Sequence, residues 1–216
     1  MTREENASFP HLIRSLAREQ GIEISDLQMK ILEIHRDLLE SWGERMNLTA
    51  IREPEEIARR HFLEGLLAGR FLAQSGARGT LVDLGSGNGF PAIPIRVVLP
   101  EASPLILIES SGKRASFLRA VLRAVGWADS RVESRRAERG ADLLDLPCDI
   151  FTTRGVSPFK LLREGLPFLR SGGFALLFMK REALVREVPR LPQSLRLEAE
   201  HSLPGREAGM ILLSRQ

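Results

Sequence analysis

A glycine-rich turn directly after a short apolar run is the feature that most restricts how this chain can fold. The run at residues 80–84 has the character of a buried parallel strand, and the turn after it reads Gly85-Ser86-Gly87-Asn88-Gly89. Glycines let the backbone come close to a ligand and adopt dihedral angles that other residues avoid. In a doubly wound sheet, such a turn after the first strand binds the nucleotide. We therefore expect a mostly parallel sheet with a ligand at this turn.

The chain divides into a helical part and an alternating part. Residues 1–75 are predicted to be helical, with a capping box at Ser25 and Gln28 and a second helix start at Pro54. After residue 76, strands are expected at residues 80–84, 104–109, 130–134, 149–153 and 174–179, with helices between them and a closing pair at 195–200 and 210–214. This alternation indicates a sheet with helices on both faces. We expect an N-terminal helical region, 1–75, packed on a core domain, 76–216.

Two acidic residues favour one class of ligand. A dinucleotide-binding turn reads G-x-G-x-x-G, and its amides meet a pyrophosphate. Here the spacing is G-x-G-x-G, and Asp83 stands two residues before Gly85. S-adenosylmethionine has no phosphate and carries a cationic sulfonium and ammonium, so a neighbouring acid fits it better. Glu109 ends the second strand, where an acid binds ribose hydroxyls. We expect S-adenosylmethionine to be held by Asp83, Gly85, Gly87 and Glu109.

The methyl acceptor is less constrained by the residues alone. The run Asp145-Leu146-Pro147-Cys148 matches the Asp-x-Pro-Cys pattern of enzymes that methylate cytosine C5 through a cysteine. That nucleophile should follow the fourth strand, whereas Cys148 precedes it, so we interpret Cys148 as a small buried apolar residue. Arg154 follows the strand instead and could meet the cofactor's carboxylate or the acceptor nucleotide. Guanine N7 has a free lone pair and needs only alignment, which agrees with the lack of a recognisable base.

Charge and composition bear on partners and location. The net charge is only +3, but residues 110–140 and 154–190 each hold eight Lys or Arg against three acids. Such an excess suits a polyanion, although arginine also serves as ordinary surface. The single cysteine leaves no partner for a disulfide within the chain, and the scattered histidines suggest no metal site. The sequence shows neither an apolar run long enough for a membrane span nor an N-terminal leader for export. We expect a cytoplasmic, metal-free monomer. Trp42 and Trp127 either stack on a base or pack in the core.

Several segments together resemble the RsmG family, also called glucose-inhibited division protein B. The resemblance runs in order over roughly residues 27–180, and its most specific parts are Asn47-Leu48-Thr49 and Arg60-His61. It implies a Rossmann-like class I methyltransferase of the α/β class. The expected sheet is mostly parallel and seven-stranded, with an antiparallel edge strand, and carries an N-terminal helical extension. The resemblance also implies S-adenosylmethionine-dependent methylation of N7 of one guanine in the 16S ribosomal RNA of the small ribosomal subunit.

The resemblance also implies roles for individual positions. Cofactor contacts carry over to Gly85, Phe90, Ala137, Glu138 and Arg154, with the Ala137-Glu138 pair at the adenine. RNA contacts carry over to Lys113, Arg114, Lys180 and Arg60. Other acceptors stay open, namely cytosine C5 through Cys148, a small molecule or a protein, as does a non-catalytic module that binds a nucleotide or RNA.

The chain departs from the family pattern at a few positions. Asn88 stands where the family has proline, Phe90 where it has leucine, and Gly155 where it has alanine. The family's aspartate-serine pair is replaced by Glu64-Gly65, and no basic residue stands at 207–209, just before the last strand. These departures loosen the assignment of the cofactor pocket and leave open a substrate role for the C-terminal end.

Overall fold

A computed structural model of the chain describes residues 8–46, 51, 53–136, 147–154 and 158–216. The N-terminal elements are α2 (Phe9–Glu19), α3 (Asp26–Met46), α4 (Pro54–Ile57), the π-helical segment η1 (Ala58–Leu63) and α5 (Glu64–Gln74). Then come β1 (Leu81–Leu84), α6 (Ala92–Val98), β2 (Leu105–Ile108), α7 (Gly112–Ala124), β3 (Arg131–Glu133) and β4 (Cys148–Arg154). The last are α8 (Pro158–Gly165), η3 (Leu166–Phe168), β5 (Leu169–Lys180), α9 (Arg181–Glu187), η4 (Val188–Arg190), β6 (Leu195–Ser202) and β7 (Ala208–Arg215).

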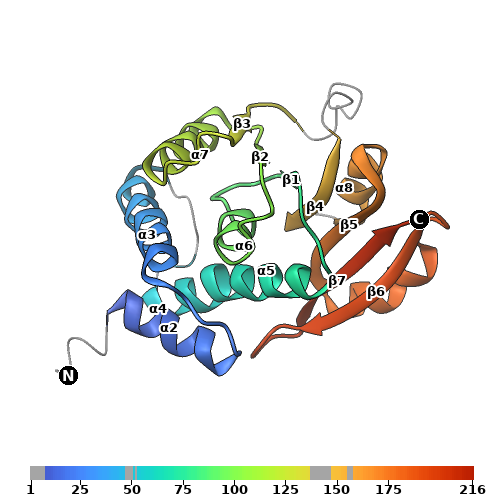
Figure 1. Cartoon of the computed structure of the whole chain (residues 1–216), viewed down its shortest axis with the longest axis horizontal. Helices are drawn as coiled ribbons and strands as arrows, with labels where there is room; N and C mark the ends of the chain where they lie inside the picture. Colours follow the sequence, from blue (N-terminus) through green and yellow to red (C-terminus); the bar gives the residue numbers. More distant parts are fainter. Residues whose placement is uncertain (1–7, 47–50, 52, 137–146, 155–157) are drawn as a thin grey trace.

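The seven strands form one sheet in the order β3-β2-β1-β4-β5-β7-β6 (Figure 1). Strands β1 to β5 pair in parallel, and β7 pairs antiparallel with both β5 and β6. The predicted fold class is therefore confirmed, with one difference in the sheet: the antiparallel strand is not at its edge. Strands β6 and β7 are joined by a short turn, so they must run antiparallel, and β7 enters between β5 and β6.

Each face of the sheet is covered by its own hydrophobic cluster. Along β2, Leu105 and Leu107 belong to one cluster, and Ile106 and Ile108 belong to the other. This division follows from the alternation of side chains along a strand. Every residue of β1 and β2 is buried, so neither strand has a polar face, and Asp83 is the one charged residue in them.

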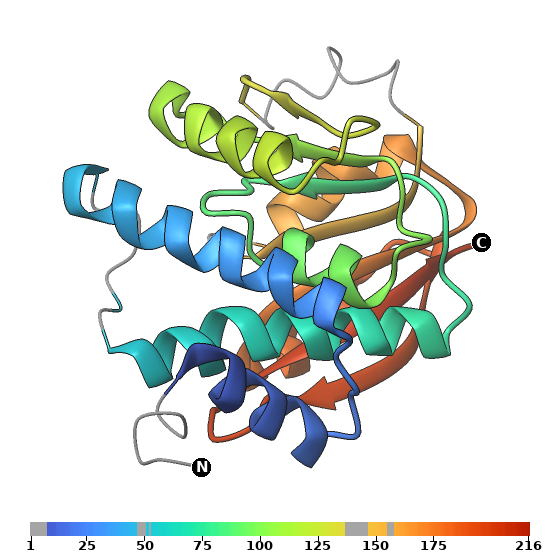
Figure 2. The ribbon, with the colours of Figure 1, turned by 60° about the vertical axis from the view of Figure 1, so that its left-hand side comes forward.

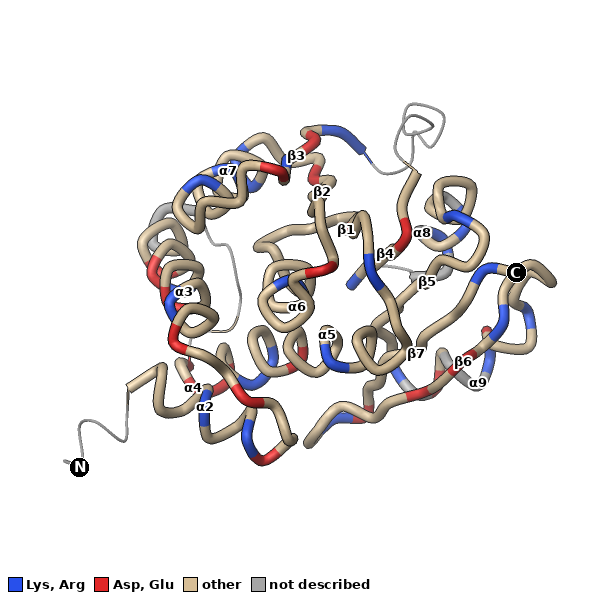
Figure 3. The backbone as a smooth tube through the Cα atoms, viewed as in Figure 1, with Lys and Arg blue, Asp and Glu red and all other residues tan. Residues whose placement is uncertain are grey.

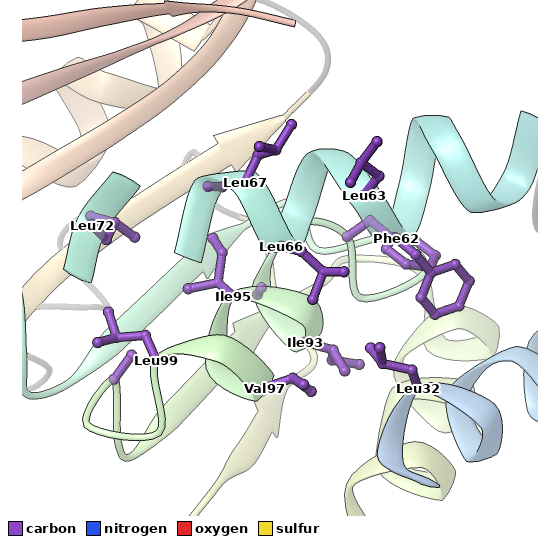
Figure 4. Packing of buried hydrophobic residues seen from close by; sticks show 14 of the residues in the cluster. Leu32, Phe62, Leu63, Leu66, Leu67, Leu72, Ile93, Ile95, Val97 and Leu99 are labelled. Carbon is purple, nitrogen blue, oxygen red and sulfur yellow. The ribbon is translucent and has the colours of Figure 1, made fainter. Parts of the chain in front are cut away.

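The N-terminal helices pack on one face of the sheet as part of its larger cluster. In Figure 2, α3, α5, α6 and α7 lie together in front of the strands. Figure 4 shows Leu66 of α5 and Leu32 of α3 pointing toward Ile93 and Ile95 of α6. The division of the chain at residue 75 stays a prediction, since this cluster runs across it.

Two local predictions in the N-terminal region can be compared with the structure. The capping box is confirmed: the Ser25 amide donates to Gln28 Oε1 at 2.9 Å, and the Gln28 amide donates to Ser25 Oγ at 3.3 Å. The helix expected from Pro54 is present, but it contains the π-helical segment Ala58–Leu63 between α4 and α5. Such segments occur frequently at functional sites.

Candidate cofactor and acceptor site

The glycine turn follows β1 at the carboxyl edge of the sheet. The amides of Gly85 and Ser86 donate to the carbonyl of Ile108 at 2.9 and 3.0 Å, which ties the turn to the end of β2. Gly85 has a φ of 72°, and a Cβ at this position would meet no atom within 4 Å. A Cβ at Gly89 would instead lie 2.3 Å from Cδ1 of Ile93. The turn is thus packed tightly against α6 at one end and open at the other.

Asp83 is a buried carboxyl group beside this open backbone. Its residue is 1% exposed, and neither carboxylate oxygen has a hydrogen-bond partner among the described residues. Burial, with a smaller contribution from the nearby charge of Glu109, raises the pKa of Asp83 to about 7, although the Ser86 hydroxyl acts in the opposite direction. Buried polar atoms are rarely left without partners in folded proteins. These two oxygens therefore fit a ligand that brings positive charge or hydrogen-bond donors.

Glu109 connects the glycine turn to the start of α7. Its Oε2 accepts a hydrogen bond from the amide of Gly87 at 2.9 Å, and its Oε1 accepts one from the amide of Ser111 at 2.8 Å. Arg114 Nε lies 3.7 Å from Oε1. A carboxylate can accept about four hydrogen bonds, so capacity for ribose hydroxyls is left. The predicted pair of acids, Asp83 and Glu109, thus lies at the predicted turn.

The ring of Phe90 packs against two histidine side chains instead of facing the glycine turn. Its ring is stacked between two histidine rings, with His35 at 4.5 Å and His61 at 4.8 Å between centroids. His35 Nε2 also lies 2.8 Å from the carbonyl of Asn88. Burial lowers the pKa of both histidines to about 4, so both are neutral at pH 7. The Phe90 side chain joins the turn to the N-terminal helices, and only its backbone is left for a cofactor.

Arg154 ends β4 at the same edge of the sheet as the turn, because Thr153 pairs with Leu84 in the register of β4 and β1. Its guanidinium forms an ion pair with Glu64, which is 3% exposed. Its Nη1 atom is buried without a hydrogen-bond partner among the described residues. A buried donor of this kind, at the same edge of the sheet as the glycine turn, is suited to an oxyanion or a base edge.

Glu64 and Arg206 complete this cluster and were not among the predicted site residues. Arg206, in the turn between β6 and β7, donates to Glu64 Oε1 at 2.8 Å. The signal for Glu64 was present in the sequence, since it is the only acid in the apolar stretch from Phe62 to Leu72. The signal for Arg206 was absent, because nothing local connects it to a residue 142 positions away.

The residues predicted to contact RNA lie on or near the same edge. Lys113 and Arg114 are exposed in the first turn of α7, and Lys180 is exposed at the end of β5. Arg60 lies in η1, next to His61, and pairs with Glu56 at 2.6 Å. Ala137, Glu138 and the segment Asn47-Leu48-Thr49 lie outside the described residues.

Cys148 lies at the start of β4, at the opposite end of that strand from Arg154. It is fully buried, its Sγ donates to the carbonyl of Phe168 at 3.6 Å, and burial raises the pKa of its thiol to about 12. A thiol of this kind is neither ionised nor accessible.

We predict that Cys148→Ala keeps its methyl-transfer activity within about twofold and that the native thiol resists Ellman's reagent until the chain unfolds. Loss of transfer in a folded variant would bring back the cysteine nucleophile.

No helix in the described ranges is both long and apolar enough to cross a membrane. Within the same ranges, no three His, Cys, Asp or Glu side chains gather as a metal site would require.

Comparison with known proteins gives a consistent result. A sequence model of the family GidB, described as rRNA small subunit methyltransferase G, matches residues 28–206. The ribosomal RNA small subunit methyltransferase G of Chloroflexus aggregans is 38% identical over 156 residues, which cover 71% of this chain and 64% of that protein. The protein of the same name from Xanthomonas euvesicatoria pv. vesicatoria is 35% identical over 201 residues, covering 89% and 90%. A solved structure described as a candidate O-methyltransferase from Klebsiella pneumoniae has a TM-score of 0.64 at 15% identity, covering 95% and 96%, and so shares the fold.

Proposed function

This chain belongs to the rRNA small subunit methyltransferase G family, and we propose that it transfers a methyl group from S-adenosylmethionine to N7 of one guanine in 16S ribosomal RNA. The family model covers most of the chain, which supports ribosomal RNA as the substrate class. The observation that carries the cofactor is the buried, unpartnered carboxyl group of Asp83 beside an open glycine backbone.

The cofactor pocket in this proposal consists of residues from the ends of β1 and β2. S-adenosylmethionine supplies a methyl group on a positively charged sulfur. Asp83 faces its cationic part, the open backbone at Gly85 and Gly87 lies along it, and Glu109 accepts hydrogen bonds from the ribose. Phe90 contributes through its backbone, since its ring is held by His35 and His61. Ala137 and Glu138 are proposed for the adenine from the family resemblance.

The chemistry asks little of the protein beyond alignment. Guanine N7 presents its lone pair directly, so no residue has to remove a proton before the methyl is transferred. Arg154 is then a positioning group: Glu64 holds its guanidinium at the end of β4, and Nη1 is left to hold the acceptor or the cofactor's carboxylate. The burial of Cys148 at the other end of the strand argues against cytosine C5 as the acceptor.

The RNA in this proposal lies across the carboxyl edge of the sheet. Lys113 and Arg114 from α7, Lys180 from β5 and Arg60 from η1 would contact its phosphates. We propose that the enzyme is a monomer in the cytoplasm and that its partner is the small ribosomal subunit. We also propose that residues 1–75 form a helical region packed on the methyltransferase core, 76–216.

The decisive experiment is to map the methyl group. Small subunits from cells that lack the corresponding gene, and deproteinised 16S RNA from the same cells, are incubated with the protein and S-adenosylmethionine. Chain scission by borohydride and aniline then locates N7-methylguanine. We expect one modified guanine, formed only in the presence of the protein. Methylation at cytosine C5, or no methylation of either substrate, would contradict the proposed function.

A further inference from the structure

A groove of about 480 Å³ lies where the end of α7 meets the start of β3. Its volume is within the range of roughly 300–1,000 Å³ that is typical of ligand pockets. Its lining combines apolar and basic side chains: Leu122, Trp127 and Val132 with Arg119, Arg123 and Arg131. A lining of this composition offers apolar surface for a flat ring together with guanidinium groups for an anion.

The groove is separate from the candidate cofactor site. Arg131 begins β3, whereas the glycine turn follows the last residue of β1, so the two features lie at opposite ends of the parallel strands. Helix α7 connects them, because it starts beside Glu109 and ends at the groove. Its 13 residues span about 20 Å at a rise of 1.5 Å per residue.

The charge along α7 is of one sign. The helix contains Lys113, Arg114, Arg119 and Arg123, and it contains no Asp or Glu. Figure 3 shows these basic positions along α7 and further ones beyond β3. Arg119 and Arg123 are exposed, and neither has a carboxylate within ion-pair distance among the described residues. Their positive charge is therefore available to a ligand.

The acids near the groove are already neutralised. Asp129 Oδ1 and Oδ2 accept from Arg96 Nη2 at 2.8 and 2.9 Å. Glu133 accepts from both Arg131 at 2.9 Å and Arg135 at 2.7 Å. Neither carboxylate therefore opposes an anion at the groove, and the surface there remains positive.

Trp127 is held in place at this groove. The guanidinium carbon of Arg96 lies 4.4 Å from the centroid of its ring, and Arg96 is in turn fixed by Asp129. This stacking covers part of the ring, and the ring also lines the groove, so a ligand would pack on the part that Arg96 leaves uncovered. An indole that is oriented in advance loses little conformational freedom when a flat group packs on it.

We propose that this groove binds one unpaired nucleotide of an RNA strand, with the base against Trp127 and the phosphate at Arg119 and Arg123. Single-stranded nucleic acids bind proteins by this combination of aromatic stacking and a basic surface. The strand continues along α7 toward Lys113, so the groove anchors the substrate about 20 Å from the methyl transfer. The inference rests on the proposed function in taking RNA as the partner.

The test uses Trp127 as its own reporter. The chain has two tryptophans, so Trp42→Phe leaves Trp127 as the only one, and phenylalanine keeps an aromatic ring against Phe117. The full-length protein is titrated with a ten-nucleotide single-stranded RNA of mixed sequence while the tryptophan fluorescence is recorded. We expect saturable quenching, and we expect Arg119→Gln/Arg123→Gln to weaken binding at least tenfold.

The matched control removes the same charge elsewhere. Arg163 and Arg190 are exposed in α8 and η4, and Arg163→Gln/Arg190→Gln should weaken binding less than threefold. The groove variant should also flatten the dependence of log affinity on log salt by roughly 0.7, the change expected for one lost phosphate contact on a single strand. Its affinity for S-adenosylmethionine, measured by calorimetry, should not change.

Three outcomes would overturn the groove proposal: no quenching of Trp127, equal binding by the groove and control variants, or equal quenching by polyglutamate. The proposed function fails separately, through the methyl-mapping experiment. If RNA binds through the groove but is not methylated, the groove proposal stands and the proposed methyl transfer is rejected.

Discussion

Asp83→Asn is expected to weaken S-adenosylmethionine binding strongly and at the same time to stabilise the folded protein at alkaline pH. The substitution keeps the shape of the side chain and removes the charge that faces the cationic ligand. Loss of one member of a buried charge pair costs about 2–5 kcal/mol, so we expect affinity to fall at least about 30-fold. Calorimetric titration of the folded variant measures this loss directly.

The gain in stability follows from the shifted pKa of Asp83. Its pKa is raised from 3.8 to about 7 in the folded protein, chiefly by burial. The folded state therefore holds the proton more tightly, and stability is lost as pH rises from about 4 to 7. Asparagine avoids this loss. We expect Asp83→Asn to raise the free energy of unfolding by about 1–3 kcal/mol at pH 8, with the difference shrinking toward pH 4.

A matched control is Asp37→Asn, which removes an exposed acid from α3. It should alter neither cofactor affinity nor the pH dependence of stability. Wild-type affinity in Asp83→Asn would remove Asp83 from the cofactor site. A lower melting temperature at pH 8 would contradict the argument from burial, whatever the affinity.

Glu64→Gln is expected to destabilise the protein by about 3–5 kcal/mol, the cost of breaking a buried ion pair. Glu64 is 3% exposed and faces two guanidinium groups, Arg154 and Arg206. Without its charge, two arginines face each other across a buried amide. Urea unfolding, followed by circular dichroism, measures the change. Arg206→Gln is the matched control: its side chain is 35% exposed and the pair with Arg154 survives, so less than half of that loss is expected.

Arg154→Ala separates the two roles of the same cluster. Glu64 keeps Arg206 as a partner in this variant, so we expect a stability loss of about 1–3 kcal/mol and a folded protein at 25 °C. Methyl transfer should fall at least about 100-fold, because the group that positions the reactants is gone. Undiminished transfer in this variant would remove Arg154 from the site. A Glu64→Gln variant of wild-type stability would show that the ion pair is not the anchor of the cluster.

Sequence reasoning succeeded where the determinants are local. The apolar run, the glycine turn and the acids at Asp83 and Glu109 are short patterns, and the structure brings them together at one edge of the sheet. The capping box at Ser25 depends on four consecutive residues and was likewise predictable.

It failed where residues far apart in the chain meet. Glu64 and Arg154 are 90 positions apart, and their pairing depends on how the tertiary fold brings the start of α5 to the end of β4. The role of the Phe90 ring was missed for the same reason, since its histidine partners come from two separate helices. The predicted start of the fifth strand was also wrong: the strand was expected from residue 174, yet β5 starts at Leu169 and continues through Gly172 and Gly173.

The π-helical segment Ala58–Leu63 has a consequence for how this region tolerates change in length. A π segment accommodates one extra residue within the hydrogen-bond ladder of an otherwise α-helical segment. Each residue of an α-helix turns the chain by about 100°. Deleting one residue here would leave the helix intact but rotate His61 away from Phe90 or Glu64 away from Arg154. An insertion or deletion in this helix would therefore rotate one end of the helix relative to the other. The number of residues in the helix is thus constrained as strictly as their identity.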